Sequence, residues 1–153
     1  MARRQATLAV ACAALLVAVG CGEGGVSSGA TVSVYVAAPL CAEAQKELAR
    51  EDGSAGEVRV RAVCLGKVEN GGRLDLAAIG ANARRATEDS TSVGYIEKEG
   101  PAVRFSQSIL DSAGIAYVDA SSGAPAMARL LKVIGDADSS SLRDSVHEAL
   151  NQT

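Results

Sequence analysis

The chain has 153 residues, of which 48% are hydrophobic and 22% are charged, and its formal net charge at pH 7 is −3. The acidic balance argues against nucleic-acid binding, which needs a basic surface to replace the counterions of the phosphates. The hydrophobic content excludes a mainly disordered chain, and the length suits a single domain. With no Trp and one Phe, the core must be largely aliphatic.

The first 20 residues have the pattern of a bacterial lipoprotein signal. Two arginines precede an uncharged run of mostly Ala, Val and Leu, which is too short for a membrane-spanning helix. The sequence Ala-Val-Gly-Cys at 18–21 has the form of a lipobox, in which cleavage leaves Cys21 as a lipidated N-terminus. We therefore predict a signal peptide over 1–20, a flexible Gly- and Ser-rich tether over 21–31, and a membrane-anchored protein on the outer face of the cytoplasmic membrane.

From residue 32 onward, the hydrophobic periodicity alternates between that of strands and that of helices. Short β-branched or alternating runs predict four strands, at 32–36, 58–62, 93–96 and 115–118. Apolar residues at helical spacing predict a helix after each strand, with the four stripes starting near Cys41, Leu76, Ala102 and Pro125. A final short helix carries Leu142, Val146 and Leu150.

This order of elements predicts an α/β fold: a single doubly wound, mainly parallel four-stranded sheet flanked by helices, plus a short C-terminal helix. We expect the strand order 2-1-3-4. Arg59 and Arg61 place the second strand at one edge, since charge there discourages further pairing. The folded domain should cover 32–134, followed by a linker and helix over 135–153.

Ligands of open parallel sheets bind beyond the carboxyl ends of the strands, near the point where strand order reverses. The turn after the first strand, 36–42, has no glycine, which argues against NAD and FAD, and no P-loop sequence occurs. His147 is the only histidine, and there is no Cys-x-x-Cys pair. These facts argue against a serine hydrolase and the common zinc sites. We expect no enzyme activity, no cofactor and no metal site.

Two cysteines fall near the carboxyl ends of strands that we expect to be neighbours. In an exported protein Cys41 and Cys64 would meet an oxidising environment, and a disulfide between them would contribute roughly 3 kcal/mol in the chain-entropy model. The alternative is two buried thiols that act as small hydrophobic groups. The sequence leaves both open, because the Cα separation decides.

The segment 120–124 is a second candidate site. Ser121 and Ser122 offer hydroxyls, and the start of the following helix offers backbone N–H groups, which together suit an anion or a carboxylate. The alternative is a serine turn that only caps the helix.

Two stretches resemble a known family. The sequence of 79–89 with the strand 93–96, and the sequence of 109–115 leading into Ala-Ser-Ser-Gly at 120–123, look like the first lobe of type 1 periplasmic binding proteins. These are the branched-chain amino acid (leucine-binding) receptors of ABC importers. The resemblance covers roughly residues 32–134. A lipoprotein signal suits such a receptor.

The resemblance implies a small ligand such as an amino acid, held by the loops after the third and fourth strands. It also implies an ABC permease or a second-lobe partner. Ser121 and Ser122 match the family's Ser-rich turn, whereas the loop 97–101 departs from the family pattern and keeps Gly100 as its glycine. The residues after 134 are too few for a second lobe, so we expect weak binding by a single lobe that does not close over its ligand.

Without a second lobe, the strand 115–118 would form an apolar, uncharged edge that invites pairing with another chain. We predict that the C-terminal helix partly covers this edge, or that the protein associates through it. Two functional hypotheses follow. One is a membrane-tethered solute receptor with a single lobe. The other is an envelope interaction or structural lipoprotein that retains the fold without ligand binding, which the altered loop 97–101 favours.

Overall fold

The computed structural model describes residues 29–152. The predicted signal peptide, the lipidation site Cys21 and the tether before Gly29 lie outside the described residues. Within 29–152, no helix has both the length and the apolar character needed to cross a membrane.

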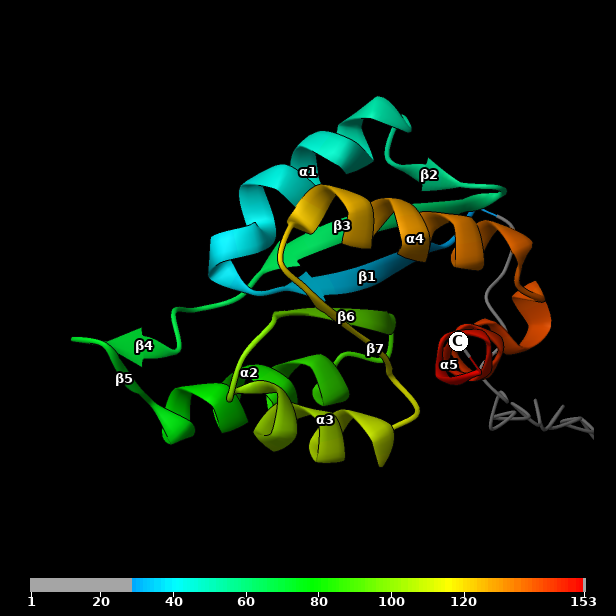
Figure 1. Ribbon diagram of the computed structural model, residues 1–153. Helices are drawn as coiled ribbons and strands as arrows, with labels where there is room; N and C mark the ends of the chain where they lie inside the picture. The colour runs from blue at the N-terminus through cyan, green and yellow to red at the C-terminus, as the bar shows by residue number, and fades with distance from the viewer. Residues whose placement is uncertain (1–28, 153) are drawn as a thin grey trace, which may run out of the picture.

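The structure is a curled, mostly parallel sheet with helices on both faces (Figure 1). Four parallel strands form its main part, and they are β1 (Thr31–Val36), β3 (Val58–Cys64), β6 (Ser92–Lys98) and β7 (Ala116–Ala120). The sheet order is β2-β3-β1-β6-β7. The predicted order of the four main strands, 2-1-3-4, is therefore confirmed.

The prediction of a four-stranded sheet with its second strand at the edge is wrong. A fifth strand, β2 (Ser54–Ala55), pairs antiparallel with the start of β3, opposite Val58 and Arg59. Gly53 and Gly56 have φ angles of 68° and 59°, in the left-handed region that favours glycine. The break after the first helix therefore also reverses the chain, and its two central residues lie along β3.

The helices divide between the two faces of the sheet. Figure 1 shows α1 (Cys41–Arg50) and α4 (Gly123–Asp136) on one face, with α2 (Leu76–Glu88) and α3 (Val103–Asp111) on the other. A 3-10 turn, η1 (Ala38–Leu40), joins β1 to α1. A two-stranded hairpin, β4 (Glu69–Asn70) and β5 (Arg73–Leu74), precedes α2.

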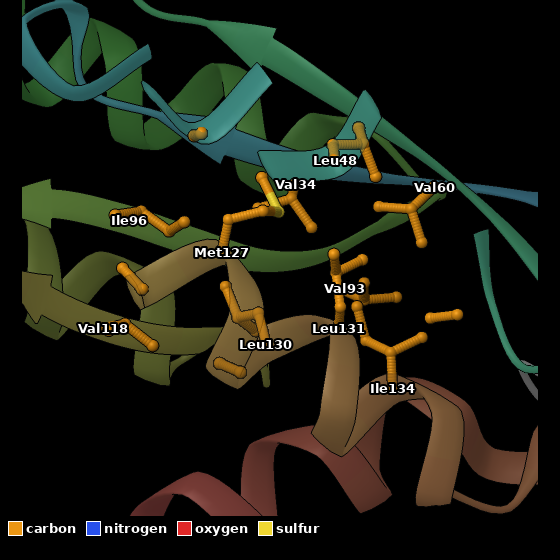
Figure 2. Close-up of a cluster of buried hydrophobic side chains, with 14 of the residues drawn as sticks. Val34, Leu48, Val60, Val93, Ile96, Val118, Met127, Leu130, Leu131 and Ile134 are labelled. Carbon is orange, nitrogen blue, oxygen red and sulfur yellow. The ribbon is translucent and has the colours of Figure 1, made fainter. Parts of the chain in front are cut away.

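Strand alternation sends side chains to two separate cores. Val34 of β1 packs beneath α1 and α4, whereas the neighbouring Tyr35 packs on the side of α2 and α3. Figure 2 shows Met127 and Leu130 of α4 among the side chains of the first core. Gly94 permits this close packing, because a Cβ there would lie 3.0 Å from Leu130 Cδ2. The largely aliphatic core expected from the composition is therefore divided by the sheet.

The C-terminal helix belongs to the first core. After the 3-10 turn η2 (Ser139–Ser141), α5 (Leu142–Asn151) packs against β6 and β7, and its three apolar residues are buried with those of α4. Ala116 and Val118 of β7 are buried as well. The helix thus packs against β6 and β7 together, and the prediction that it covers the outer edge of the last strand stays a prediction. Within the described residues, β7 is the last strand of the sheet on this side.

Removal of an α5 side chain tests this packing. Leu142→Ala should lower the free energy of unfolding by about 2–5 kcal/mol, because Leu142 is 0% exposed and its loss leaves a cavity. The same substitution at Leu76, which is 56% exposed, is the matched control and should cost far less. Chemical denaturation measures both, and equal losses would contradict the placement of α5 in the core.

Cys41 and Cys64 are joined by a disulfide, with Cα atoms 5.6 Å apart. The sequence left open a disulfide or two buried thiols, and the structure has the disulfide. The bond links the first residue of α1 to the last residue of β3. It therefore ties two segments together at the carboxyl edge of the sheet.

Replacing both cysteines, Cys41→Ala with Cys64→Ala, should lower the free energy of unfolding by roughly 3 kcal/mol. The reason is that a cross-link over a sequence separation of 23 restricts the unfolded chain. Denaturation of the unaltered protein under reducing conditions separates the loss of the bond from the loss of packing by the buried Cys41. An unchanged stability on reduction would contradict this account.

Candidate functional site

A cavity of about 420 Å³ opens at the carboxyl end of the parallel strands. Its walls come from 37–39 after β1, 65–69 after β3, Leu74 and Asn82, and the end of β6 with the loop that follows, 97–102. The connection after β1 leads to β3 on one side of β1, and the connection after β3 leads to β6 on the other side. The strand order therefore reverses beside β1, which is where open parallel sheets form their ligand crevices.

Glu97 lies inside the fold rather than in a loop. The predicted third strand ended at Ile96, but β6 continues to Lys98 because both added residues pair with β7, Glu97 opposite Asp119 and Lys98 opposite Ala120. As a result Glu97 is only 2% exposed, and it lines the cavity. The prediction that Glu97 belongs to an altered loop over 97–101 is therefore wrong.

The Glu97 carboxyl group has few partners for a buried acid. One oxygen accepts a hydrogen bond from the Lys98 backbone N–H at 3.1 Å, and the other accepts a long one from the Ser106 hydroxyl at 3.5 Å. None of the ion pairs among the described residues includes it. Desolvation by burial therefore raises the pKa of Glu97 above its ordinary value, and the two hydrogen bonds only partly oppose this rise.

Two tyrosines surround the same carboxyl group. The rings of Tyr95 and Tyr117 are stacked with centroids 6.2 Å apart, and within 29–152 neither hydroxyl has a hydrogen-bond partner, although both are buried. The Tyr95 hydroxyl is near enough to affect the pKa of Glu97, but the two groups do not meet in hydrogen-bond geometry. Burial raises the pKa of both tyrosines, so they stay neutral. Tyr95 also lines the cavity.

The serine turn has a partner from its own chain. The Ser122 hydroxyl donates to Glu43 Oε2 at 2.7 Å, and the backbone N–H of Gly123 donates to the same oxygen at 2.9 Å. These bonds hold the pKa of the Glu43 carboxyl below its ordinary value. The start of α4, where an anionic ligand was expected, thus already binds a carboxylate from α1.

The close contact between α1 and α4 explains why Glu43 reaches this turn. A Cβ at Gly123 would lie 2.1 Å from the carbonyl oxygen of Leu40, so only glycine permits the approach. Of the predicted ligand-binding residues, Gly100 lines the cavity, while Ser121 and Ser122 do not. The structure therefore does not bring these three residues into one site.

The predicted site residues include neither Tyr95 nor Glu97, two polar residues that line the cavity. Tyr95 is buried in the core on the side of α2 and α3, and Glu97 was predicted to lie in a loop. The signal was present, because residues two apart on a strand face the same side of the sheet. An acid two positions after a buried aromatic, at the end of a central strand, indicates a polar group on that same face.

A second polar cluster lies before β6 and has its hydrogen bonds satisfied. Asp89 accepts hydrogen bonds from the Tyr35 hydroxyl at 3.0 Å and from the N–H and hydroxyl of Thr91 at 2.8 and 2.7 Å. Burial alone would raise the pKa of Asp89, but these bonds outweigh it and lower the pKa to about 2. We interpret this cluster as structural. Within 29–152, no group of three or more His, Cys, Asp or Glu side chains could hold a metal ion.

No family model, no characterised protein and no solved structure matches the sequence. The resemblance to the first lobe of periplasmic binding proteins therefore stays a hypothesis, based on 79–89 with 93–96 and on 109–115 with 120–123. The α/β fold itself hosts many activities and does not choose among them.

A comparison of the buried Glu97 with the exposed Glu99 tests whether burial of the Glu97 carboxyl group affects stability. Ionised Glu97 is unfavourable in the fold, so stability should rise as the pH falls through its raised pKa toward the ordinary glutamate value. Glu97→Gln should be more stable than the unaltered protein at pH 7 and should lack this rise. Denaturation between pH 4 and 8 measures the effect. Glu99→Gln is the matched control. If Glu97→Gln loses more stability than Glu99→Gln at pH 7, ionised Glu97 is not unfavourable in the fold and the prediction is contradicted.

Proposed function

We propose that this protein is an exported, lipid-anchored binding protein of the cell envelope, related to the amino-acid-binding component of ABC importers. Its α/β domain binds a small polar ligand in the cavity at the carboxyl end of the sheet, weakly or with a partner. The observation that carries this proposal is a cavity of about 420 Å³ at the strand-order reversal, with a buried carboxyl group in its lining. Small-molecule sites are typically roughly 300–1,000 Å³ in volume.

The lining of the cavity supports binding more than catalysis. Apolar walls, including Leu65, Val68 and Pro101, surround a few polar groups, which is the usual composition of a small-molecule site. No Ser, Cys or His is among the described residues that line it. The lining therefore lacks the nucleophile and base that acyl transfer of the serine or cysteine type would need.

The cavity is formed within one α/β domain, and we expect this domain alone to bind its ligand weakly. An ABC permease or a second-lobe partner placed over 65–69 and 97–102 would exclude water from the ligand and strengthen binding. The predicted lipid anchor on Cys21 would keep the protein at the membrane, where such a permease lies.

One observation favours the second candidate function, an envelope interaction or structural lipoprotein that retains the fold without ligand binding. The Ser-rich turn that the resemblance implies as a ligand contact is occupied by Glu43. In this alternative, the outer edge of β7 at 116–120 would pair with another chain, because exposed strand edges favour such pairing.

A melting experiment separates the two functions. The purified protein is heated with a panel of amino acids, carboxylic acids and sugars at millimolar concentrations. A ligand present at ten times its Kd should add about 1.4 kcal/mol to the free energy of unfolding and raise Tm. A flat panel on a protein that melts cooperatively would contradict ligand binding by this lobe and favour the alternative.

Two variants then locate the site. Gly66→Leu should abolish the rise in Tm, because Gly66 lines the cavity and a leucine side chain there would fill part of it. A Cβ at Gly66 would lie 3.6 Å from Oδ1 of Asn82, which also lines the cavity. Ser122→Ala should retain it, since Ser122 is not in the lining. The opposite pattern would place the ligand at the serine turn.

A further inference from the structure

We infer that the cavity selects ligands that carry an ammonium group, which the carboxylate of Glu97 and the hydroxyl of Tyr95 bind together. This inference rests on the proposed function and names its ligand class. The ligands it describes are small aliphatic amines, including amino acids bound through their amino group.

The first argument is the buried carboxyl group of Glu97. A carboxylate that is 2% exposed normally has a cationic partner or several good hydrogen bonds. Glu97 has one ordinary hydrogen bond and one at 3.5 Å, and no ion-pair partner within 29–152. A cation that enters the cavity would supply the missing partner, whereas a ligand carboxylate would be repelled there.

The second argument is the Tyr95 hydroxyl. Tyr95 is 0% exposed and lines the same cavity, and its hydroxyl has no hydrogen-bond partner among the described residues. An ammonium group has three N–H donors, whereas a carboxylate and a phenol oxygen each accept. Two of the three donors can therefore be satisfied by Glu97 and Tyr95, two residues on the same face of β6.

The remaining lining suits the rest of such a ligand. Leu65, Val68 and Pro101 provide apolar walls for an aliphatic chain. Lys67 and Lys98 are exposed and also line the cavity, where a positive charge attracts the carboxylate of an amino acid. An amino acid would then point its ammonium group toward Glu97 and its carboxylate toward the lysines.

Binding should also depend on pH, because only ionised Glu97 attracts the ammonium group. The titratable and charged groups that face Glu97 or share its cavity are Tyr95, Tyr117, Asp119, Lys67, Glu69, Lys98 and Glu99. Burial raises the pKa of Glu97. Amine affinity should therefore fall as the pH is lowered below that pKa. Because about one proton competes with each bound ligand, the loss of affinity should approach about tenfold per pH unit.

The experiment uses three probes that share one aliphatic chain: leucine, 3-methylbutylamine, which lacks the carboxylate, and 4-methylpentanoate, which lacks the amine. Leucine and 3-methylbutylamine should raise Tm and bind in calorimetry, and 4-methylpentanoate should bind and stabilise much more weakly than either. Stabilisation by 4-methylpentanoate equal to that by the amine would overturn the inference.

Variants at Glu97 supply the second readout. Glu97→Gln should weaken binding of 3-methylbutylamine by about tenfold or more and remove its pH dependence, because a charged hydrogen bond becomes a neutral one. Tyr95→Phe should weaken it by a smaller factor. Glu88→Gln removes the same charge from an exposed residue outside the lining and should leave the affinity nearly unchanged. Equal effects of Glu97→Gln and Glu88→Gln would contradict a specific ion pair.

The outcomes distinguish this inference from the proposed function. If a sugar or a carboxylic acid raises Tm in a manner that Gly66→Leu abolishes, but no amine does, the cavity is a binding site and the ammonium inference fails alone. If no probe in either experiment raises Tm, both fail. We expect Glu97→Gln to be stable. Its melting curve without ligand shows whether it is folded, and therefore whether any loss of binding follows from unfolding.

Discussion

The structure depends on the double pairing of β1, which joins β3 in parallel on one side and β6 in parallel on the other. The helices lie on both faces of this sheet, α1 and α4 on one face and α2 and α3 on the opposite face. The two pairings also make the connections after β1, β3 and β6 diverge at one edge, where the cavity opens. The disulfide between Cys41 and Cys64 fixes part of that edge, because it links the start of α1 to the end of β3.

Two acids at this edge have opposite environments. Glu43 accepts short hydrogen bonds from Ser122 and Gly123 at the start of α4, which lower its pKa, so its charge is already stabilised within the protein. Glu97 is buried with poor hydrogen bonds, which raises its pKa. A ligand gains little by competing with Glu43 and its partners. A cationic ligand gains most beside Glu97, whose carboxyl group has no ion-pair partner among the described residues, so we propose the binding site there and not at the serine turn.

Periodicity and the rules of parallel sheets were enough to predict the four main strands, their order and the helices between them. They could not predict β2, because two residues carry no periodic signal and their pairing depends on the turn at Gly56. The site was predicted in part: the loop containing Gly100 does line the cavity, but the predicted strand stopped at Ile96 and left Glu97 outside it, whereas β6 continues to Lys98. The bond between Ser122 and Glu43 joins residues 79 positions apart, so it depends on helix packing that no local pattern reveals.

The central claim is that the cavity beside Glu97, and not the serine turn, is where this lobe binds a small ligand. The most direct test is an NMR titration of the ¹⁵N-labelled protein with leucine, in which backbone amide shifts are followed residue by residue. Our account predicts saturable shifts concentrated in 65–69 and 97–102, with little change at 121–123. Shifts centred on 121–123, or no saturable shifts at any residue, would contradict it.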